Sequence, residues 1–193
     1  MDFELSREQQ MIVDATIKFV RQESNVERFR QMRSTEIGWD KQVWKDMGDY
    51  GWLGIAFPES VGGIGGNFVD LALILEQFGR GLVPEPLIAS VVLAGSVLEK
   101  LGSDQQHAAY LSPMIDGDTS LALAYAERQS RYNLADCLTT AVRTGNEFVI
   151  NGEKVWVLNG HAADHVLVVS RTIGDQFDEQ GLSIFVVPQS APG

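Results

Sequence analysis

The hydrophobic pattern of this chain changes its period once, near residue 118. Before that point apolar residues recur at the three- and four-residue spacings of α-helices, and after it short apolar runs have the composition of β-strands. No helix of useful length interrupts the second part, and strands without crossover helices favour an antiparallel sheet or barrel over a parallel dinucleotide-binding sheet. The sequence therefore predicts an α+β chain, with an all-α helical bundle over residues 1–118 followed by an antiparallel β-sheet or barrel domain over residues 119–193.

Five segments of the first part have helical patterns. Ser6 and Gln9 have the spacing of a capping box, and apolar residues continue at helical intervals from Ile12 to Val26. Pro113 is expected to kink or shorten the last helix, because proline cannot donate a backbone hydrogen bond. The other predicted helices cover residues 40–50, 68–78, 87–98 and 104–115.

The second part contains six short runs with strand composition. Asn151-Gly152 lies between two of them and predicts a hairpin turn, since both residues tolerate positive φ, and Asn159-Gly160 marks another turn. Nothing after the last run closes the sheet, so we expect the natural polypeptide to continue or a partner chain to complete that edge. The predicted strands are residues 120–126, 137–143, 148–150, 155–158, 165–170 and 182–187.

Charge and cysteine usage exclude several classes of protein. The net charge is −11 and the pI about 4.6, which argues against nucleic-acid binding and against attraction to an anionic membrane surface. The longest apolar stretch, residues 87–98, is too short to span a bilayer, and the N-terminus does not resemble a signal peptide. Cys137 is the only cysteine, which fits a reducing compartment and predicts a buried, inert thiol. We therefore expect a soluble, cytoplasmic protein.

Two motifs that suggest a site do not meet its requirements. The glycine-rich segment 61–66 lacks the spacing of a dinucleotide loop and follows no strand, so a flexible turn is the favoured interpretation over a phosphate loop. His107, His161 and His165 have no cysteine or carboxylate partners at suitable intervals, so no metal site is predicted.

Six segments carry characteristic phrases in a fixed order: residues 53–63 (LGIAFPESVGG), 76–80 (EQFGR), 124–127 (AYAE), 148–160 (FVINGEKVWVLNG), 163–164 (AD) and 181–187 (GLSIFVV). Each is weak alone, but their joint order and spacing resemble the acyl-CoA dehydrogenase family over essentially the whole chain. The resemblance implies an N-terminal helical domain and a middle β-domain. In full-length family members a C-terminal four-helix bundle follows, so the resemblance implies that these 193 residues correspond to the part before that bundle.

The resemblance implies FAD-dependent α,β-dehydrogenation of an acyl-CoA thioester. In the family a glutamate removes the α-proton, the β-hydrogen leaves as hydride to the flavin, and an electron-transfer flavoprotein accepts the electrons. That glutamate usually lies in the C-terminal bundle, and Glu127 matches a structural glutamate of the family instead. No catalytic residue is therefore expected in this chain, which should be inactive alone, whereas the full-length protein should be a homo- or hetero-oligomer.

The resemblance also assigns flavin contacts by position. Leu123, Tyr125 and Ala126 match the strand along the isoalloxazine edge, and Trp156 matches a tryptophan that packs against the ring, although ordinary core packing is the alternative for Trp156. Tyr132 stands where the family has a serine that touches pyrophosphate and substrate. The implied cofactor-binding residues are Leu123, Tyr125, Ala126, Tyr132, Trp156, Val157 and Leu158.

Three of these positions depart from the family pattern. Ala126, Tyr132 and Leu158 replace two threonines and the serine, which removes neutral hydrogen bonds worth ~1 kcal/mol each. Arg128 and Arg131 lie in the same loop, and guanidinium groups bind pyrophosphate well. They either replace the lost contacts or are solvated loop arginines. Tyr132 and Arg131 are also the candidates for substrate contact.

Three functions fit these features. The first is a divergent acyl-CoA dehydrogenase, with a bulky substrate such as a steroid side chain suggested by similar loop departures in other members. The second is a non-catalytic, flavin-poor partner subunit of a heteromeric enzyme, which the residues at positions 126, 132 and 158 favour. The third keeps the fold and changes the chemistry to an acyl-CoA oxidase or flavin monooxygenase.

Overall fold

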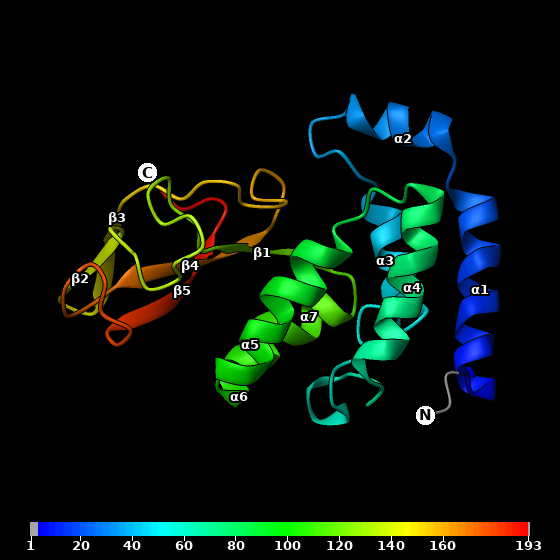
Figure 1. Ribbon diagram of the computed structural model, residues 1–193, viewed down its shortest axis with the longest axis horizontal. Coiled ribbons are helices and arrows are strands. Elements are labelled where there is room, and N and C mark those ends of the chain that lie inside the picture. The colour runs from blue at the N-terminus through cyan, green and yellow to red at the C-terminus, as the bar shows by residue number, and fades with distance from the viewer. Residues whose placement is uncertain (1–3, 193) are drawn as a thin grey trace. The chain divides into compact units, whose positions relative to one another are not determined.

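The computed structural model describes residues 4–192 and consists of two compact units, one ending at Thr119 and the other beginning at Ser120. The first is helical and the second contains the strands (Figure 1), so the α+β class is confirmed. The helical elements are α1 (Arg7–Glu23), α2 (Val26–Arg33), α3 (Lys41–Asp49), η1 (Glu59–Val61), α4 (Phe68–Gly81), η2 (Ile88–Gly95), α5 (Ser96–Leu101), α6 (Asp104–Gln106), η3 (His107–Leu111) and α7 (Ser112–Ile115). The strands are β1 (Leu121–Ala124), β2 (Thr140–Thr144), β3 (Glu147–Asn151), β4 (His165–Arg171) and β5 (Leu182–Pro188).

Side-chain caps set the N-termini of α1 and α2. The Gln9 amide donates to Ser6 Oγ at 3.2 Å and the Ser6 amide donates to Gln9 Oε1 at 3.1 Å, so the predicted capping box is confirmed. The helical pattern that continues to Val26 in the sequence is interrupted at Ser24, however. There Asn25 accepts a hydrogen bond from the Arg28 amide at 2.8 Å and caps α2 as a separate helix.

An aromatic cluster forms the core between α1 and α4, which pack against each other (Figure 1). The ring of Phe19 on α1 lies 5.1 Å from that of Trp52 and 5.9 Å from that of Phe78 on α4, measured between centroids. All three side chains are buried. The Phe19–Trp52 pair is edge-to-face and the Phe19–Phe78 pair is tilted. Aromatic pairs of this kind add to the stabilisation from burial alone, so these rings help fix how the two helices pack.

The helix predicted over residues 104–115 is divided into α6, η3 and α7. Pro113 has no amide to donate to the carbonyl of the preceding turn, and the chain is wound in wider, π-helical turns over residues 107–111 just before it. Residues 87–98 also begin with wide turns, in η2, before α5. Within residues 4–192, every helix is too short or too polar to cross a membrane.

The strand unit is built around β4. Strand β5 pairs with β4 antiparallel, from His165 opposite Pro188 to Arg171 opposite Leu182, whereas β1 pairs with β4 in parallel. The antiparallel hairpin β2–β3 joins β4 through Thr140 and Arg171. The sheet is therefore mixed and not wholly antiparallel as expected, because the chain between β1 and β4 forms the β2–β3 hairpin and then returns parallel to β1 without a crossover helix.

Two local predictions in the strand unit are also corrected. The hairpin turn is at Gly145-Asn146, between β2 and β3, and not at Asn151-Gly152. Residues 155–158 form no strand, because Trp156 has a left-handed backbone with φ of 56° that ends any extended run. The expectation that more chain or a partner covers the free edge of β5 stays a prediction.

Candidate functional site

An open cleft in the strand unit brings together two segments that are distant in sequence. It has a volume of about 690 Å³, and its walls come from the loop after β1 and from the segment that ends at Trp156. The Val155 amide donates to the Ala126 carbonyl at 2.9 Å, which joins the two segments. The lining residues are Ala126, Glu127, Arg128, Arg131, Tyr132, Val155 and Trp156.

Two large aromatic side chains lie uncovered at this cleft. The side chain of Trp156 is 90% exposed and that of Tyr132 is fully exposed, whereas Trp39, Trp44 and Trp52 of the helical unit are buried. The left-handed backbone of Trp156 is rare and costly for a residue with a bulky side chain. Exposure together with backbone strain argues against a core-packing role for Trp156 and is typical of a binding surface.

At the cleft, the buried carboxylate of Glu127 accepts hydrogen bonds from four nitrogen donors. Its Oε1 atom accepts from Lys154 Nζ at 2.7 Å and from the Thr139 amide at 2.9 Å. Its Oε2 atom accepts from the Leu138 amide and from Gln129 Nε2, both at 2.8 Å. Because Lys154 also reaches the Tyr125 carbonyl at 3.4 Å, the pair ties the loop after β1 to the segment that carries Trp156.

The environment of Glu127 keeps it ionised. Burial alone would raise the pKa of this carboxyl, but the hydrogen bonds from Lys154, Thr139, Gln129 and Leu138 outweigh burial and hold the pKa well below its usual range. A carboxylate with such a low pKa and with both oxygens engaged is a poor proton acceptor. Its role in this arrangement is to fix the two walls of the cleft.

The lone thiol of Cys137 lies beside this pair. Its Sγ atom is 3.4 Å from Glu127 Oε1 and 3.5 Å from Lys154 Nζ, and the residue is 3% exposed. Burial raises the pKa of the Cys137 thiol. A buried, protonated thiol is a weak nucleophile, in keeping with the inert role predicted from the sequence.

The lowered pKa of Glu127 predicts a specific dependence of stability on pH. A depressed carboxyl pKa stabilises the fold above the unfolded value of ~4.3, and this contribution is lost as the pH falls toward the folded pKa. The free energy of unfolding should therefore differ most between wild type and Glu127→Gln at pH 7, and the difference should narrow at pH 3.5. Urea unfolding of both proteins at the two pH values measures this difference. An equal difference in unfolding free energy at pH 7 and pH 3.5 would contradict the lowered pKa of Glu127.

The two arginines of the cleft differ in their partners. Arg128 Nε donates to Glu153 Oε1 at 2.7 Å, in an ion pair whose side chains are both largely exposed. Arg131 is exposed and forms no ion pair with any residue between 4 and 192. Its backbone, like that of Trp156, is left-handed, with φ of 48°. The cleft thus has one neutralised and one unneutralised guanidinium group.

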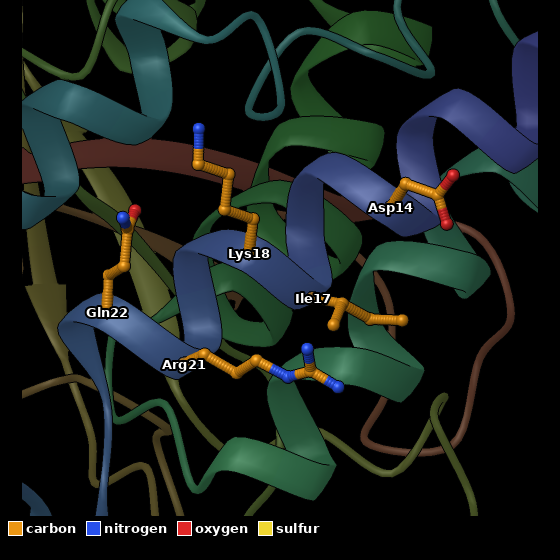
Figure 2. Close-up of a pocket in the computed structure, with 5 residues that line it drawn as sticks. All are labelled: Asp14, Ile17, Lys18, Arg21 and Gln22. Atoms are coloured by element: carbon orange, nitrogen blue, oxygen red, sulfur yellow. The ribbon is translucent and has the colours of Figure 1, made fainter.

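The glycine-rich segment and a hollow on α1 lack the features of a site. The glycine-rich segment uses its amides internally, since those of Gly63, Gly65 and Gly66 donate to carbonyls of residues 55–58. A hollow on α1 is lined by one helix face alone, and Figure 2 shows its side chains diverging rather than converging on one point. No group of three or more metal-ligating side chains is found among residues 4–192.

Comparison with known proteins identifies the family. The model of the acyl-CoA dehydrogenase N-terminal domain matches residues 6–118, and that of the acyl-CoA dehydrogenase middle domain matches residues 122–193. The chain belongs to the acyl-CoA dehydrogenase family. The resemblance drawn from the six sequence phrases is confirmed.

Individual relatives agree with the family assignment. The probable acyl-CoA dehydrogenase YngJ of Bacillus subtilis is 32% identical over 195 residues, covering 100% of this chain and 51% of YngJ. A chain solved in work on the electron transferring flavoprotein of Acidaminococcus fermentans is 30% identical with a TM-score of 0.86, covering 100% of this chain and 50% of that one. A chain of the ChsE4–ChsE5 complex from Mycobacterium tuberculosis is 27% identical with a TM-score of 0.83, and the coverage is again 100% and 50%. This chain spans 51% of YngJ and 39% of the acyl-CoA dehydrogenase FadE29 of Mycobacterium tuberculosis.

The acyl-CoA dehydrogenase motifs are only partly gathered at the cleft. Ala126, Tyr132, Trp156 and Arg131 line it together. Leu123 is half-buried in β1 opposite Leu167. The remaining residues assigned to flavin from the family pattern, which do not line the cleft, are Tyr125, Val157 and Leu158.

Sequence reasoning missed the buried groups that shape the cleft. Lys154 lies 27 residues from Glu127 in sequence, and no local spacing links them. Asp136 Oδ1 accepts from Gln129 Nε2 at 3.2 Å and from Gln176 Nε2 at 2.7 Å, which ties the cleft loop to the β4–β5 connection. The one sequence signal for such buried groups is a charged residue within an otherwise apolar, strand-like segment.

Proposed function

We propose that this chain binds FAD at the cleft beside Trp156 and forms the flavin-binding part of an acyl-CoA dehydrogenase. The family to which it belongs is FAD-dependent. The observation that carries the proposal is the exposed indole of Trp156, which is held on the cleft wall in a strained backbone conformation. Such a flat, uncovered aromatic surface suits the stacking of a planar ring system.

The residues of the cleft fit a flavin nucleotide in two respects. Trp156 offers the apolar face that an isoalloxazine ring needs, and the guanidinium group of Arg131 offers positive charge in a chain whose net charge is −11. The hydroxyls lost at Ala126 and Leu158, and the replacement of the family serine by Tyr132, reduce the number of neutral hydrogen bonds expected from the family pattern. A charge-assisted contact is worth roughly twice a neutral one, which offsets part of that loss.

FAD, when bound, supplies the acceptor for hydride from the β-carbon of the acyl chain. The residues of this chain would orient the ring and exclude water from it. The α-proton needs a separate base, and Glu127 does not offer one because its carboxylate is fully engaged. We infer that the base, and with it turnover, comes from residues outside this cleft.

The same proposal includes an acyl-CoA substrate and an electron-transfer flavoprotein as electron acceptor. Both are family properties, and one similar solved chain comes from work on an electron transferring flavoprotein. A bulky acyl chain is also proposed, since another similar chain is described as part of a steroid acyl-CoA dehydrogenase, at 28% identity and a TM-score of 0.85.

Reconstitution with FAD tests the proposal. The 193-residue chain, incubated with excess FAD and then desalted, is expected to retain the visible absorption of a bound flavin. Trp156→Leu should weaken FAD binding about tenfold through lost stacking. Phe177→Leu is the matched control, because Phe177 is an exposed aromatic residue of the same unit away from the cleft. Loss of flavin from the wild type on desalting would count against the proposal.

A non-catalytic, flavin-poor subunit is the second candidate. The departures from the family pattern at positions 126, 132 and 158 favour it, as does the similarity to one chain of the ChsE4–ChsE5 complex, an assembly of two different subunits. The same reconstitution separates the two functions. A wild-type chain that stays colourless with excess FAD would favour the partner-subunit role.

A further inference from the structure

Of the two arginines at the cleft, only one has its charge available for a ligand. The ion pair of Arg128 with Glu153 occupies its Nε atom and cancels much of its field. Arg131 has no such carboxylate partner among residues 4–192, although the chain carries 26 acidic residues. A guanidinium group without a carboxylate partner attracts anions. It binds most tightly to an anion that accepts two parallel hydrogen bonds, such as a phosphate.

The backbone holds Arg131 at the cleft. Ser130 Oγ donates to the Glu127 carbonyl at 2.9 Å and accepts from the Glu127 amide at 3.0 Å, so the turn before Arg131 is closed. The Asn133 amide donates to the Ser130 carbonyl at 2.8 Å and closes the turn after it. These bonds over-determine the loop and keep Arg131 in a left-handed conformation that arginine rarely adopts.

We propose that Arg131 binds a phosphate or pyrophosphate group of a ligand whose planar ring lies against Trp156, and that Arg128 does not. The proposal rests on the proposed function of the cleft and deepens it by naming the anion-binding residue. Both side chains line the same cleft, so one extended ligand with a ring and a phosphate would contact both. The phosphate chemistry is shared by the pyrophosphate of FAD and by the phosphates of CoA.

Matched substitutions test the proposal. Arg131→Asn removes the charge while keeping a residue that tolerates positive φ, and Arg128→Asn makes the same change three residues earlier. Dissociation constants are measured by isothermal titration for the wild type and both variants with FAD, riboflavin, CoA and pantetheine. Riboflavin and pantetheine lack the pyrophosphate, so they report on ring and chain contacts alone.

Arg131→Asn is expected to weaken the phosphorylated ligand about 10- to 100-fold and to leave its unphosphorylated counterpart unchanged. If only the affinity for FAD falls, the ligand of Arg131 is the pyrophosphate of FAD. If only the affinity for CoA falls, its ligand is a phosphate of CoA. Arg128→Asn should change binding less than threefold. The wild-type binding of FAD should also weaken with added salt more steeply than that of Arg131→Asn.

Two outcomes would overturn the proposal in different ways. If the wild type binds FAD or CoA and Arg131→Asn binds each equally well, or if Arg128→Asn loses as much affinity, the role of Arg131 fails while the proposed function stands. If the wild type binds neither FAD nor CoA, the proposed function and the role of Arg131 fail together.

Discussion

Replacing Arg171 by methionine is expected to lower the free energy of unfolding of the strand unit by about 4 kcal/mol. Arg171 lies at the end of β4, is 6% exposed, and its guanidinium donates to main-chain carbonyls rather than to a carboxylate. Methionine fills similar space but donates nothing, so six main-chain carbonyls lose the hydrogen bonds that the buried guanidinium gives them. The six acceptors are the carbonyls of Ala135, Cys137, Ile173, Gln176, Asp178 and Gln180.

Hydrogen exchange of the β4 amides during urea titration measures this effect within the strand unit. Arg143→Met is the control, because Arg143 is exposed on β2 and its guanidinium donates, among residues 4–192, to the Gly145 carbonyl alone. That variant should change the free energy of unfolding by less than ~0.5 kcal/mol. Equal effects of the two substitutions would show that the carbonyls around Arg171 are satisfied without it.

Replacing Lys154 by methionine is expected to cost about 3–5 kcal/mol of unfolding free energy, because it leaves the carboxylate of Glu127 buried and without its cation. The two side chains are 7% and 3% exposed, and their charged atoms lie 2.7 Å apart. Glu153→Gln is the control, since it breaks the exposed pair with Arg128, and pairs of that kind contribute ~0–1 kcal/mol.

A double variant separates the ion pair from its packing. Glu127→Gln with Lys154→Met removes both charges and keeps one amide oxygen, which can accept from the Leu138 amide or the Thr139 amide but not from both, since these donate to different oxygens of Glu127. The double variant should be less destabilised than the sum of the two single variants, because neither charge is left unpaired. Strictly additive losses would contradict a direct coupling between Glu127 and Lys154.

Local signals in the sequence predict much of the helical unit. Ser6 and Gln9 define the start of α1, and the helix predicted over residues 68–78 is α4. Such features depend on contacts three or four residues apart, which a single sequence displays directly. The break at Asn25 was missed because an apolar residue, Val26, happened to continue the helical spacing.

The strand unit was harder to predict because its pairing is long-range. No periodicity shows that β1 lies parallel to β4, or that residues 155–158 leave the extended conformation at Trp156. The residue types of segment 155–158 favour a strand, but the left-handed backbone of Trp156 prevents one from forming. The turn was also misplaced, because Asn151-Gly152 has a stronger local hairpin signal than Gly145-Asn146, where β2 meets β3.

The candidate site was reached from the sequence mainly through the family resemblance. It named Ala126, Tyr132 and Trp156, which the fold brings to one cleft. It left open whether Arg128 and Arg131 act alike, and the ion pair of Arg128 with Glu153 distinguishes them. Buried groups such as Lys154 and Arg171 stayed invisible because their partners are far apart in sequence.

The most direct test of the proposed flavin binding at the cleft is nuclear magnetic resonance of the four tryptophan indole N–H groups during titration with FAD. Trp39, Trp44 and Trp52 are buried in the helical unit and act as internal controls, whereas Trp156 is 90% exposed at the cleft. We predict that FAD shifts or broadens the indole signal of Trp156 and leaves the other three unchanged. A Trp156 signal that does not respond at saturating FAD, or a response confined to the buried tryptophans, would contradict the account.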